Sequence, residues 1–405
     1  MSGIYEMKKL ISLCFLFSFV FSGLNLQGWL LLFIGPSLAQ LLTNLCLVLI
    51  IFGILLLLRN KKNISISSLS KMWIAYFFIY YIFSLLGSIV YHNPYDFFST
   101  SFALFYTIGF IFYLSYEDNL GYFENTATYV FVLANILLIY MSKNNIDIEF
   151  YNADLGYELD RAQGLYGDAN NAAVVCILGF IFAFRNISSI NRLSFCVKLA
   201  ALLICIYALF LTLSTTGFAC FILVLALLNI KYFTKEKVLL LIIIAPILYS
   251  ILYNLDKLTA GLDLNVRQKS KIDNFVNLVK LDFSSVDTSG RSDLVSNLME
   301  YLYNNPFLGR GLEFGLKKQS HNTLIYIWSD AGIIAVLFFI FLIFLYFRKS
   351  MKLVNDNKYY ILAILTTLTV FMLSLQTIIN QPYLMPVFIY ISYLIERRTG
   401  FQTTS

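Results

Sequence analysis

Long apolar segments alternate with short polar ones along most of the chain, and the lengths of the apolar segments predict membrane-spanning helices. An α-helix rises about 1.5 Å per residue, so roughly 20 apolar residues cross the hydrocarbon core of a bilayer, about 30 Å thick. The pattern predicts an all-α, polytopic integral membrane protein in which residues 1–405 form one membrane domain. We expect about 12 transmembrane helices, at residues 10–24, 36–58, 72–91, 97–116, 122–141, 169–185, 196–213, 216–230, 238–254, 322–347, 359–379 and 382–395. The number within residues 1–58 is left open, because the only breaks from Leu10 to Leu58 are Asn25–Gly28 and Gly35-Pro36.

Two of the polar segments are long. The first covers residues 142–168 and the second, late in the chain, covers residues 255–321. Within the second, Leu294, Leu298 and Leu302 recur every four residues, which predicts a short amphipathic helix over residues 291–304. Because the other connections are short, we expect binding or chemistry to occur in these two loops.

The charges predict an orientation. Charged residues make up only 13% of the chain, and cytoplasmic loops of membrane proteins are enriched in Lys and Arg. With the N-terminus in the cytoplasm, 18 of the 29 Lys and Arg residues fall in inner connections, both termini are cytoplasmic and both long loops lie outside. The acidic turn from Glu117 to Glu124 is the exception on the inner side. The net charge of +6 thus follows from topology and requires no nucleic-acid partner. No small-residue cleavage site follows the first apolar segment, which we interpret as an uncleaved helix.

Several function classes lack their usual residues. The six cysteines lie within or at the edge of apolar segments, which favours a packing role, and no Cys/His spacing predicts a zinc site. The chain has no phosphate-loop or dinucleotide-binding motif. Spans such as 72–91 and 97–116 carry no charge, and no internal repeat is found, which argues against an ion-coupled carrier. We therefore expect no metal and no cofactor, and a substrate that is delivered in or at the membrane.

Arg161 is the one basic residue at the acidic end of the first loop, and Gly164 and Asn170 follow it. On one interpretation, Arg161 pairs with Asp160 or Glu158 on a solvated surface. On the other, its guanidinium lies at the membrane edge, where a planar fork of donors grips a phosphate or a sugar. The local sequence leaves both interpretations open.

The second loop is basic. Arg291 begins the predicted amphipathic helix, where a cation costs roughly 0.3–1 kcal/mol but where free amides also favour anions. Arg291 therefore either extends into water or completes an anion site. The basic character continues toward the next span through Arg310, Lys317, Lys318, His321 and Asn322.

Two further features lie on the same side of the membrane. His321, at the start of the tenth span, is either a hydrogen-bonding anchor or a group suited to proton transfer or diphosphate contact. His92 lies in a tight turn and is interpreted as structural. The turn Ser214–Gly217 joins two spans, and its hydroxyls are suited to capping helix ends.

At these residues the chain resembles the O-antigen polymerase and O-antigen ligase superfamily of bacterial envelope polysaccharide assembly. The resemblance covers about residues 161–332 and rests on an Arg/Gly/Asn segment, a Ser/Thr-Gly turn, and a long outer loop with Gly-Arg, Asn-Pro-Phe-Leu-Gly-x-Gly and His-Asn. Two departures are evident. Family members often carry an Arg at the turn matching Ser214–Gly217, which leaves open whether Arg161 or Arg310 supplies that charge. They also commonly have Asn-Pro-Asn where this chain has Asp168-Ala169-Asn170.

The resemblance implies a metal-independent, inverting glycosyltransferase of the bacterial inner membrane, with its active face in the periplasm. The donor would be a glycan on undecaprenyl diphosphate, and the partners would include membrane lipid and, for a polymerase, a chain-length regulator. The catalytic candidates are Arg161, Arg291 and His321, and His321 would either contact the diphosphate or take the acceptor proton. The substrate-binding candidates are Gly164, Asn170, Arg310, Lys317, Lys318 and Asn322.

Three functions stay open. We place a polysaccharide polymerase first, because a short, low-charge chain with an abbreviated family pattern is typical of polymerases. Its acceptor would be a second lipid-linked repeat unit. A ligase, which would transfer the glycan to lipid A-core, is second. A lipid-linked oligosaccharide flippase is the alternative of another class, and the scarcity of intramembrane charge argues against it.

Overall fold

The computed structural model describes residues 2–59, 64–144, 161–230, 291–354 and 357–400, with isolated residues between 146 and 280. Within this part of the chain the regular secondary structure is helical, as predicted. Most of the predicted span 238–254 and most of residues 145–160 and 255–290 lie outside the described residues.

The helices follow the apolar segments closely. In chain order they are α1 (Ser2–Gly23), α2 (Leu26–Phe33), α3 (Pro36–Arg59), α4 (Ser68–Val90), α5 (Phe97–Leu114), α6 (Glu117–Lys143), the 3-10 turn η2 (Gly164–Tyr166), α7 (Ala169–Asn186), α8 (Arg192–Thr212), α9 (Thr215–Leu228), α13 (Arg291–Asn304), α14 (Phe314–Lys317), α15 (Thr323–Met351), α16 (Asn357–Met372) and α17 (Leu384–Gly400).

Judged by length and composition, fewer of the described helices could cross a membrane than the sequence pattern predicts. In the described part of the chain, 6 helices are long and apolar enough to cross a membrane, or 7 when α1 and α2, bent by 61°, count as one broken span. The prediction of about 12 spans is not confirmed. Some predicted spans form helices that are shorter than the roughly 20 residues a crossing needs: α9 has 14 residues and α16 has 16.

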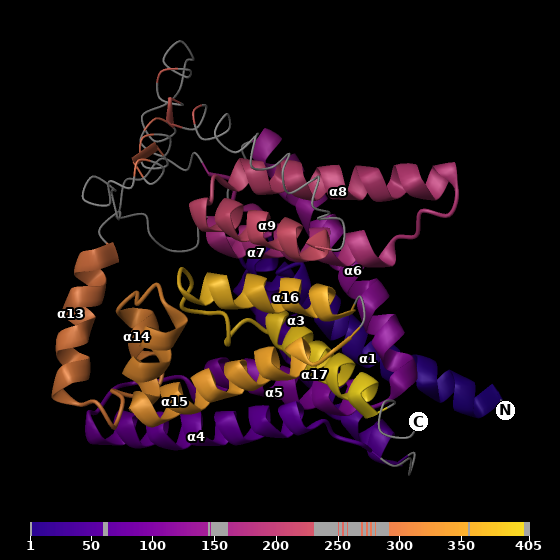
Figure 1. Cartoon of the computed structure of the whole chain (residues 1–405). Helices are drawn as coiled ribbons and strands as arrows, with labels where there is room; N and C mark the ends of the chain where they lie inside the picture. The colour runs from indigo at the N-terminus through magenta and orange to yellow at the C-terminus, as the bar shows by residue number, and fades with distance from the viewer. Residues whose placement is uncertain are drawn as a thin grey trace.

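The helices pack side by side into a bundle (Figure 1). α7 forms its centre, because it packs against α6, α8, α9 and α16 and its residues 169–183 are all buried. A second layer is built on the long pair α4 and α15, which α17 and α5 complete. A hydrogen bond from Trp73 Nε1 to Tyr346 Oη (2.8 Å) ties α4 to α15, and Tyr346 Oη donates to the Phe388 carbonyl of α17 (3.0 Å).

The two ends of the bundle differ. The N- and C-termini share one end, which we call the terminal end, and α13 and α14 lie at the opposite end, which we call the loop end (Figure 1). The acidic turn that did not fit the predicted orientation lies at the terminal end with basic partners. Asp118 pairs with Lys8 at 2.9 Å, and Glu124 pairs with Arg185 at 3.0 Å. Which side of the membrane the terminal end faces stays a prediction.

Candidate functional site

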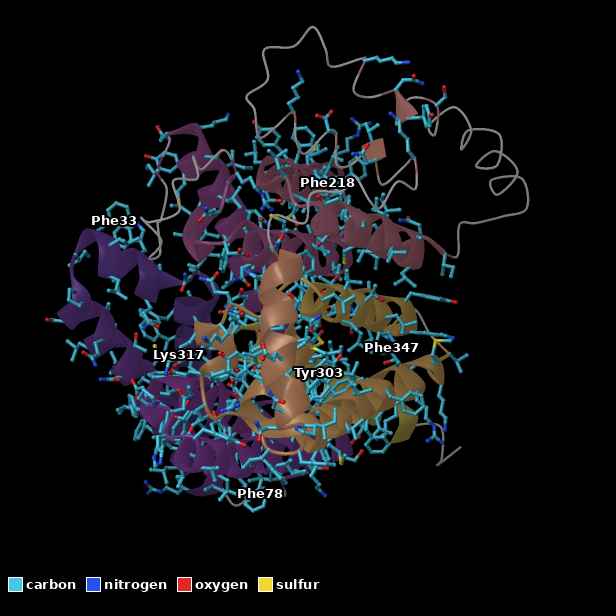
Figure 2. The ribbon with its side chains drawn as sticks, turned by 90° about the vertical axis from the view of Figure 1, so that its left-hand side faces the viewer. Phe33, Phe78, Phe218, Tyr303, Lys317 and Phe347 are labelled. Carbon is cyan, nitrogen blue, oxygen red and sulfur yellow. The ribbon has the colours of Figure 1, made fainter. Side chains whose placement is uncertain are left out.

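The loop end carries two polar clusters. We call the first, on α7, α8 and α9, the Arg161 cluster; it comprises Arg161, Asn170, Thr212 and Ser214. We call the second, on α4, α13 and the segment after it, the Arg310 cluster; it comprises Tyr91, Tyr301, Asn305, Arg310 and Lys318. Figure 2 views the molecule from this end, with α13 crossing the face, Tyr303 on it and Lys317 near it.

The Arg161 cluster joins the first loop to the turn between α8 and α9. Arg161 Nε donates to the Thr212 carbonyl (3.0 Å), and its Nη2 donates to Asn170 Oδ1 (3.5 Å). Ser214 Oγ donates to the same Asn170 oxygen (2.8 Å) and also accepts from the Gly217 amide (3.1 Å). Arg161 therefore lies at the turn where the resemblance led us to expect an Arg. Its alternative partners, Asp160 and Glu158, lie outside the described residues.

The start of α7 holds this cluster in place. Asp168 Oδ1 accepts from the backbone amides of Asn170 (2.9 Å) and Asn171 (2.8 Å), which caps the helix and satisfies two of its free amides. Gly164 precedes it in the left-handed region (φ +54°) and packs against Leu138 of α6. Gly164 thus shapes the backbone behind the cluster, and its predicted contact with substrate stays a prediction.

The Arg310 cluster is built on aromatic rings. The Arg310 guanidinium lies 4.3 Å from the centre of the Tyr91 ring and 5.4 Å from that of Tyr301, in the geometry of cation–π interactions. With the Asn305 amide oriented so that its oxygen faces Arg310, Oδ1 accepts from Arg310 Nη2 at 3.2 Å, and the amide nitrogen donates to Tyr91 Oη. Arg310 Nε is buried and has no hydrogen-bond partner among the described residues. Lys318 Nζ lies 5.5 Å from the centre of the same Tyr301 ring, so two cations share it.

The segment that carries Arg310 is threaded between α4 and α15. A Cβ on Gly309 would lie 2.2 Å from the carbonyl carbon of Asp330, so only glycine fits there. The Arg310 and Gly311 amides donate to the carbonyls of Ser329 (2.7 Å) and Asp330 (3.1 Å). These α15 carbonyls are available because the helix is interrupted at Gly332 (φ 81°, ψ 176°). Non-helical backbone within a membrane helix is tolerated where neighbouring protein satisfies it, and this segment does so.

Asp330 was missed in the sequence analysis. It is fully buried in α15, where Oδ1 accepts from the Gly315 amide (2.8 Å) and Oδ2 accepts from the Glu313 amide (3.0 Å) and from Tyr80 Oη (2.8 Å). Its carboxylate therefore fixes the turn that leads to the basic residues. The sequence did contain a signal for Asp330, because a lone carboxylate inside an apolar span is costly in a membrane and therefore indicates a specific role.

His321 lies two residues before α15 and contacts the segment between α16 and α17. Its backbone is left-handed (φ +47°), and its amide donates to Gln376 Oε1 (3.1 Å), which also accepts from Ser320 Oγ (3.1 Å). Asn322, expected to bind substrate, caps α15: its Oδ1 accepts from the amides of Leu324 (2.8 Å) and Ile325 (3.2 Å).

The remaining basic candidates lie on or near α13 and α14. Lys317 Nζ donates to the Pro94 carbonyl and lies 4.0 Å from Glu313 Oε2, so its positive charge is partly neutralised within the protein. Arg291 is the first residue of α13, but its side chain lies outside the described part. Because the other end of α13 continues toward α4 and α15, the Arg291 end points toward the layer of α7 and α9 (Figure 1).

The segment 373–383, between α16 and α17, carries three amide side chains that the sequence analysis did not single out. Gln376 contacts the His321 amide, Asn380 Nδ2 donates to Tyr326 Oη (2.7 Å), and Gln381 lines a cavity beside α7. This segment therefore reaches from α15 to the start of α7. Three amides in eleven otherwise largely apolar residues, where one predicted span ends and the next begins, could have indicated this segment. In the described part of the chain, no group of three or more His, Cys, Asp or Glu residues is arranged to hold a metal.

Comparison with known proteins identifies part of this region. Residues 200–340 match the model of a family described as O-antigen ligase (Wzy_C). No curated protein matches the chain, and no solved structure matches it. The matched stretch runs from within α8 into α15 and so includes Ser214, Arg310 and His321, whereas Arg161 and Asn170 precede it.

Proposed function

We propose that the chain is a polysaccharide polymerase, because residues 200–340 match the model of the family described as O-antigen ligase. It joins oligosaccharide repeat units carried on undecaprenyl diphosphate by inverting glycosyl transfer. The loop end faces the periplasm and holds the reaction. The protein lies in the bacterial inner membrane, and no metal ion takes part.

The observation that carries this proposal is the pair of anchored guanidinium groups at the loop end. Arg161 is fixed by the Thr212 carbonyl and Asn170, and Arg310 is held between the rings of Tyr91 and Tyr301. A guanidinium presents a planar fork of donors that matches phosphate oxygens, and an anchored fork loses little entropy on binding. Preorganised cations of this kind stabilise the negative charge that develops on a diphosphate leaving group.

The chemistry requires one bond to form and one to break. The acceptor hydroxyl oxygen attacks the anomeric carbon of the donor, and the bond from that carbon to the diphosphate oxygen breaks with its electron pair. The hydroxyl proton passes to a base, for which His321 is the candidate. Arg161 and Arg291 bind the departing diphosphate. Arg310 and Lys318 hold the second substrate, and Lys317, whose ammonium also contacts Pro94 and Glu313, contributes less.

Two clusters favour the polymerase over the ligase. In a polymerase both substrates carry an isoprenoid diphosphate, so the reaction needs two sites for the same anionic group. The Arg161 and Arg310 clusters supply one guanidinium each, on different layers of the bundle. The ligase is the second candidate, because the description of the matching family names that activity.

A lipopolysaccharide gel from a strain that lacks this gene, with and without complementation, tests the proposal. A band at core plus one repeat unit, with loss of the longer ladder, supports the polymerase. Loss of all O-antigen from the core, with polymer accumulating on its lipid carrier, selects the ligase instead. Accumulation of single lipid-linked units on the cytoplasmic side indicates a flippase. An unchanged ladder contradicts the assignment to this polysaccharide.

A further inference from the structure

A polar cavity of about 260 Å³ lies beside the Arg161 cluster. Its walls come from four segments that are distant in sequence: the junction of α1 and α2, η2, the first turn of α7, and segment 373–383. Four carboxamide side chains line it, namely Asn25, Gln27, Asn171 and Gln381. None of the described residues that line it is charged, so they do not favour a diphosphate.

Asn171 points to a ligand. Its side chain is only 8% exposed, and its Oδ1 is buried without a hydrogen-bond partner in the described part of the chain. Leaving a buried carbonyl oxygen unpaired costs about 1–3 kcal/mol, so such atoms are normally satisfied. A hydroxyl group in the cavity would donate the missing bond.

The opposite wall is already organised. Asn25, in the left-handed region at the break between α1 and α2 (φ 44°), donates through Nδ2 to the Leu165 carbonyl (2.6 Å). Tyr166, through Oη, donates to the Gly23 carbonyl, and its ring packs against Tyr383 with the ring centres 5.5 Å apart. Tyr166 and Leu31 therefore offer apolar surface between the amides.

This combination fits a sugar ring. Each carboxamide has both a donor and an acceptor, as does each sugar hydroxyl, while the C–H faces of a sugar pack on apolar and aromatic surface. Pockets for drug-sized ligands usually measure about 300–1,000 Å³, so this smaller cavity has room for one ring and not for a whole repeat unit.

The cavity adjoins the proposed phosphate site through consecutive residues. Asn170 faces Arg161 and Ser214, whereas Asn171 faces the cavity. Successive residues of an α-helix point about 100° apart, so the first turn of α7 presents one amide to each site. A sugar bound in the cavity would lie close to a diphosphate held by Arg161.

We propose that this cavity is a saccharide subsite, which binds one uncharged sugar ring of the lipid-linked glycan near its diphosphate. The inference rests on the proposed function. It goes further by naming the residues that select the glycan: Asn25, Gln27, Asn171 and Gln381.

The test uses the purified full-length chain in lipid nanodiscs and isothermal titration calorimetry. The probes are farnesyl diphosphate and a panel of farnesyl diphosphates that each carry one glucose, galactose or N-acetylhexosamine residue. We expect at least one conjugate to bind the wild type about tenfold more tightly than farnesyl diphosphate, a ratio that corresponds to about 1.4 kcal/mol. Asn171→Leu, which fills the cavity, and Gln381→Ala abolish that ratio but leave the affinity for farnesyl diphosphate unchanged.

Two controls separate this inference from the proposed function. Asn135→Ala removes another buried amide whose Oδ1 lacks a described partner, but from the middle of α6, and it keeps the tenfold ratio. Arg161→Ala weakens every probe equally. If the ratio persists in both cavity variants, or if no conjugate binds more tightly than farnesyl diphosphate, the cavity is not a saccharide subsite and the proposed function stands. If the wild type binds none of the probes, both proposals fail.

Discussion

Replacing Gly332 by Ala is expected to detach the basic segment from the bundle. Gly332 interrupts α15 with φ 81° and ψ 176°, a region that only glycine adopts readily. A Cβ at this position would lie 2.0 Å from the Phe307 carbonyl oxygen and 2.6 Å from its carbonyl carbon. Both atoms belong to the backbone, so no side-chain rotation relieves the contact.

The magnitude follows from the strain and from the bonds that must open. The backbone conformation costs an alanine about 1–3 kcal/mol. Moving residues 306–311 away from α15 also breaks four hydrogen bonds. The Pro306 carbonyl accepts from the Ile333 amide (2.9 Å) and from Trp328 Nε1 (3.0 Å), and the amides of Arg310 and Gly311 donate to the carbonyls of Ser329 (2.7 Å) and Asp330 (3.1 Å). Each contributes about 0.5–1.5 kcal/mol, which puts the total loss at about 3–9 kcal/mol. This is a large part of the roughly 5–15 kcal/mol that stabilises a typical protein.

The assay combines complementation of the glycan ladder with limited proteolysis of the purified protein. In Gly332→Ala we expect loss of the ladder and new cleavage within residues 305–320, while the helical circular dichroism is retained. Gly121→Ala is the matched control, because a Cβ there meets nothing within 4 Å. Alanine in that helix is neutral or stabilises by up to about 1 kcal/mol. A Gly332→Ala protein with the proteolysis pattern and ladder of the wild type would refute the reasoning.

Four further substitutions test separate parts of the protein. Arg161→Lys should lower the rate of glycan transfer about 100-fold, because a single ammonium replaces the fork that donates to Asn170 and that we propose binds phosphate. A rate assay with lipid-linked repeat units measures this effect. Arg291→Lys should also abolish most of the glycan ladder. Lys317→Ala should have a mild effect, because the Lys317 ammonium already binds the protein. Equal effects of the two substitutions on the ladder would contradict this ranking. Lys349→Ala breaks a partly exposed ion pair with α17 at the terminal end and should cost less than about 1 kcal/mol in thermal unfolding, with an unchanged ladder.

Much of the fold could be predicted because the length and boundaries of apolar segments are local properties. The predicted span 169–185 is α7, and the two breaks noted before residue 58 are where α2 and α3 begin, the latter at Pro36. The interruption of α15 could not be predicted in this way, because the apolar run continues through Gly332. Only the packing of residues 306–311 against α15 shows why the helix opens there.

The candidate site was predictable in its residue types and not in its pairings. Arg161 and Thr212 lie 51 residues apart, and no local pattern indicates that a guanidinium of the first loop reaches the carbonyl end of α8. Asp330 was overlooked because a single polar residue does not disturb a window of apolar ones, and Gln381 was overlooked because it falls in the short connection between two predicted spans. Asp330 meets Tyr80 of α4, and Gln381 comes to line the cavity beside the first turn of α7, only when distant segments pack together.

The position of α13 connects the two clusters into one proposed site. Its 14 residues extend about 21 Å at 1.5 Å per residue. Tyr301 anchors its C-terminal end beside Arg310, while its N-terminal end, which begins at Arg291, points toward the layer that holds Arg161. If each cluster binds one diphosphate, the glycan of the acceptor has to extend along α13. Only then does its hydroxyl reach the anomeric carbon of the donor. Substitutions along the exposed face of α13 should then alter which glycans are joined, without altering the affinity for an isoprenoid diphosphate that carries no sugar.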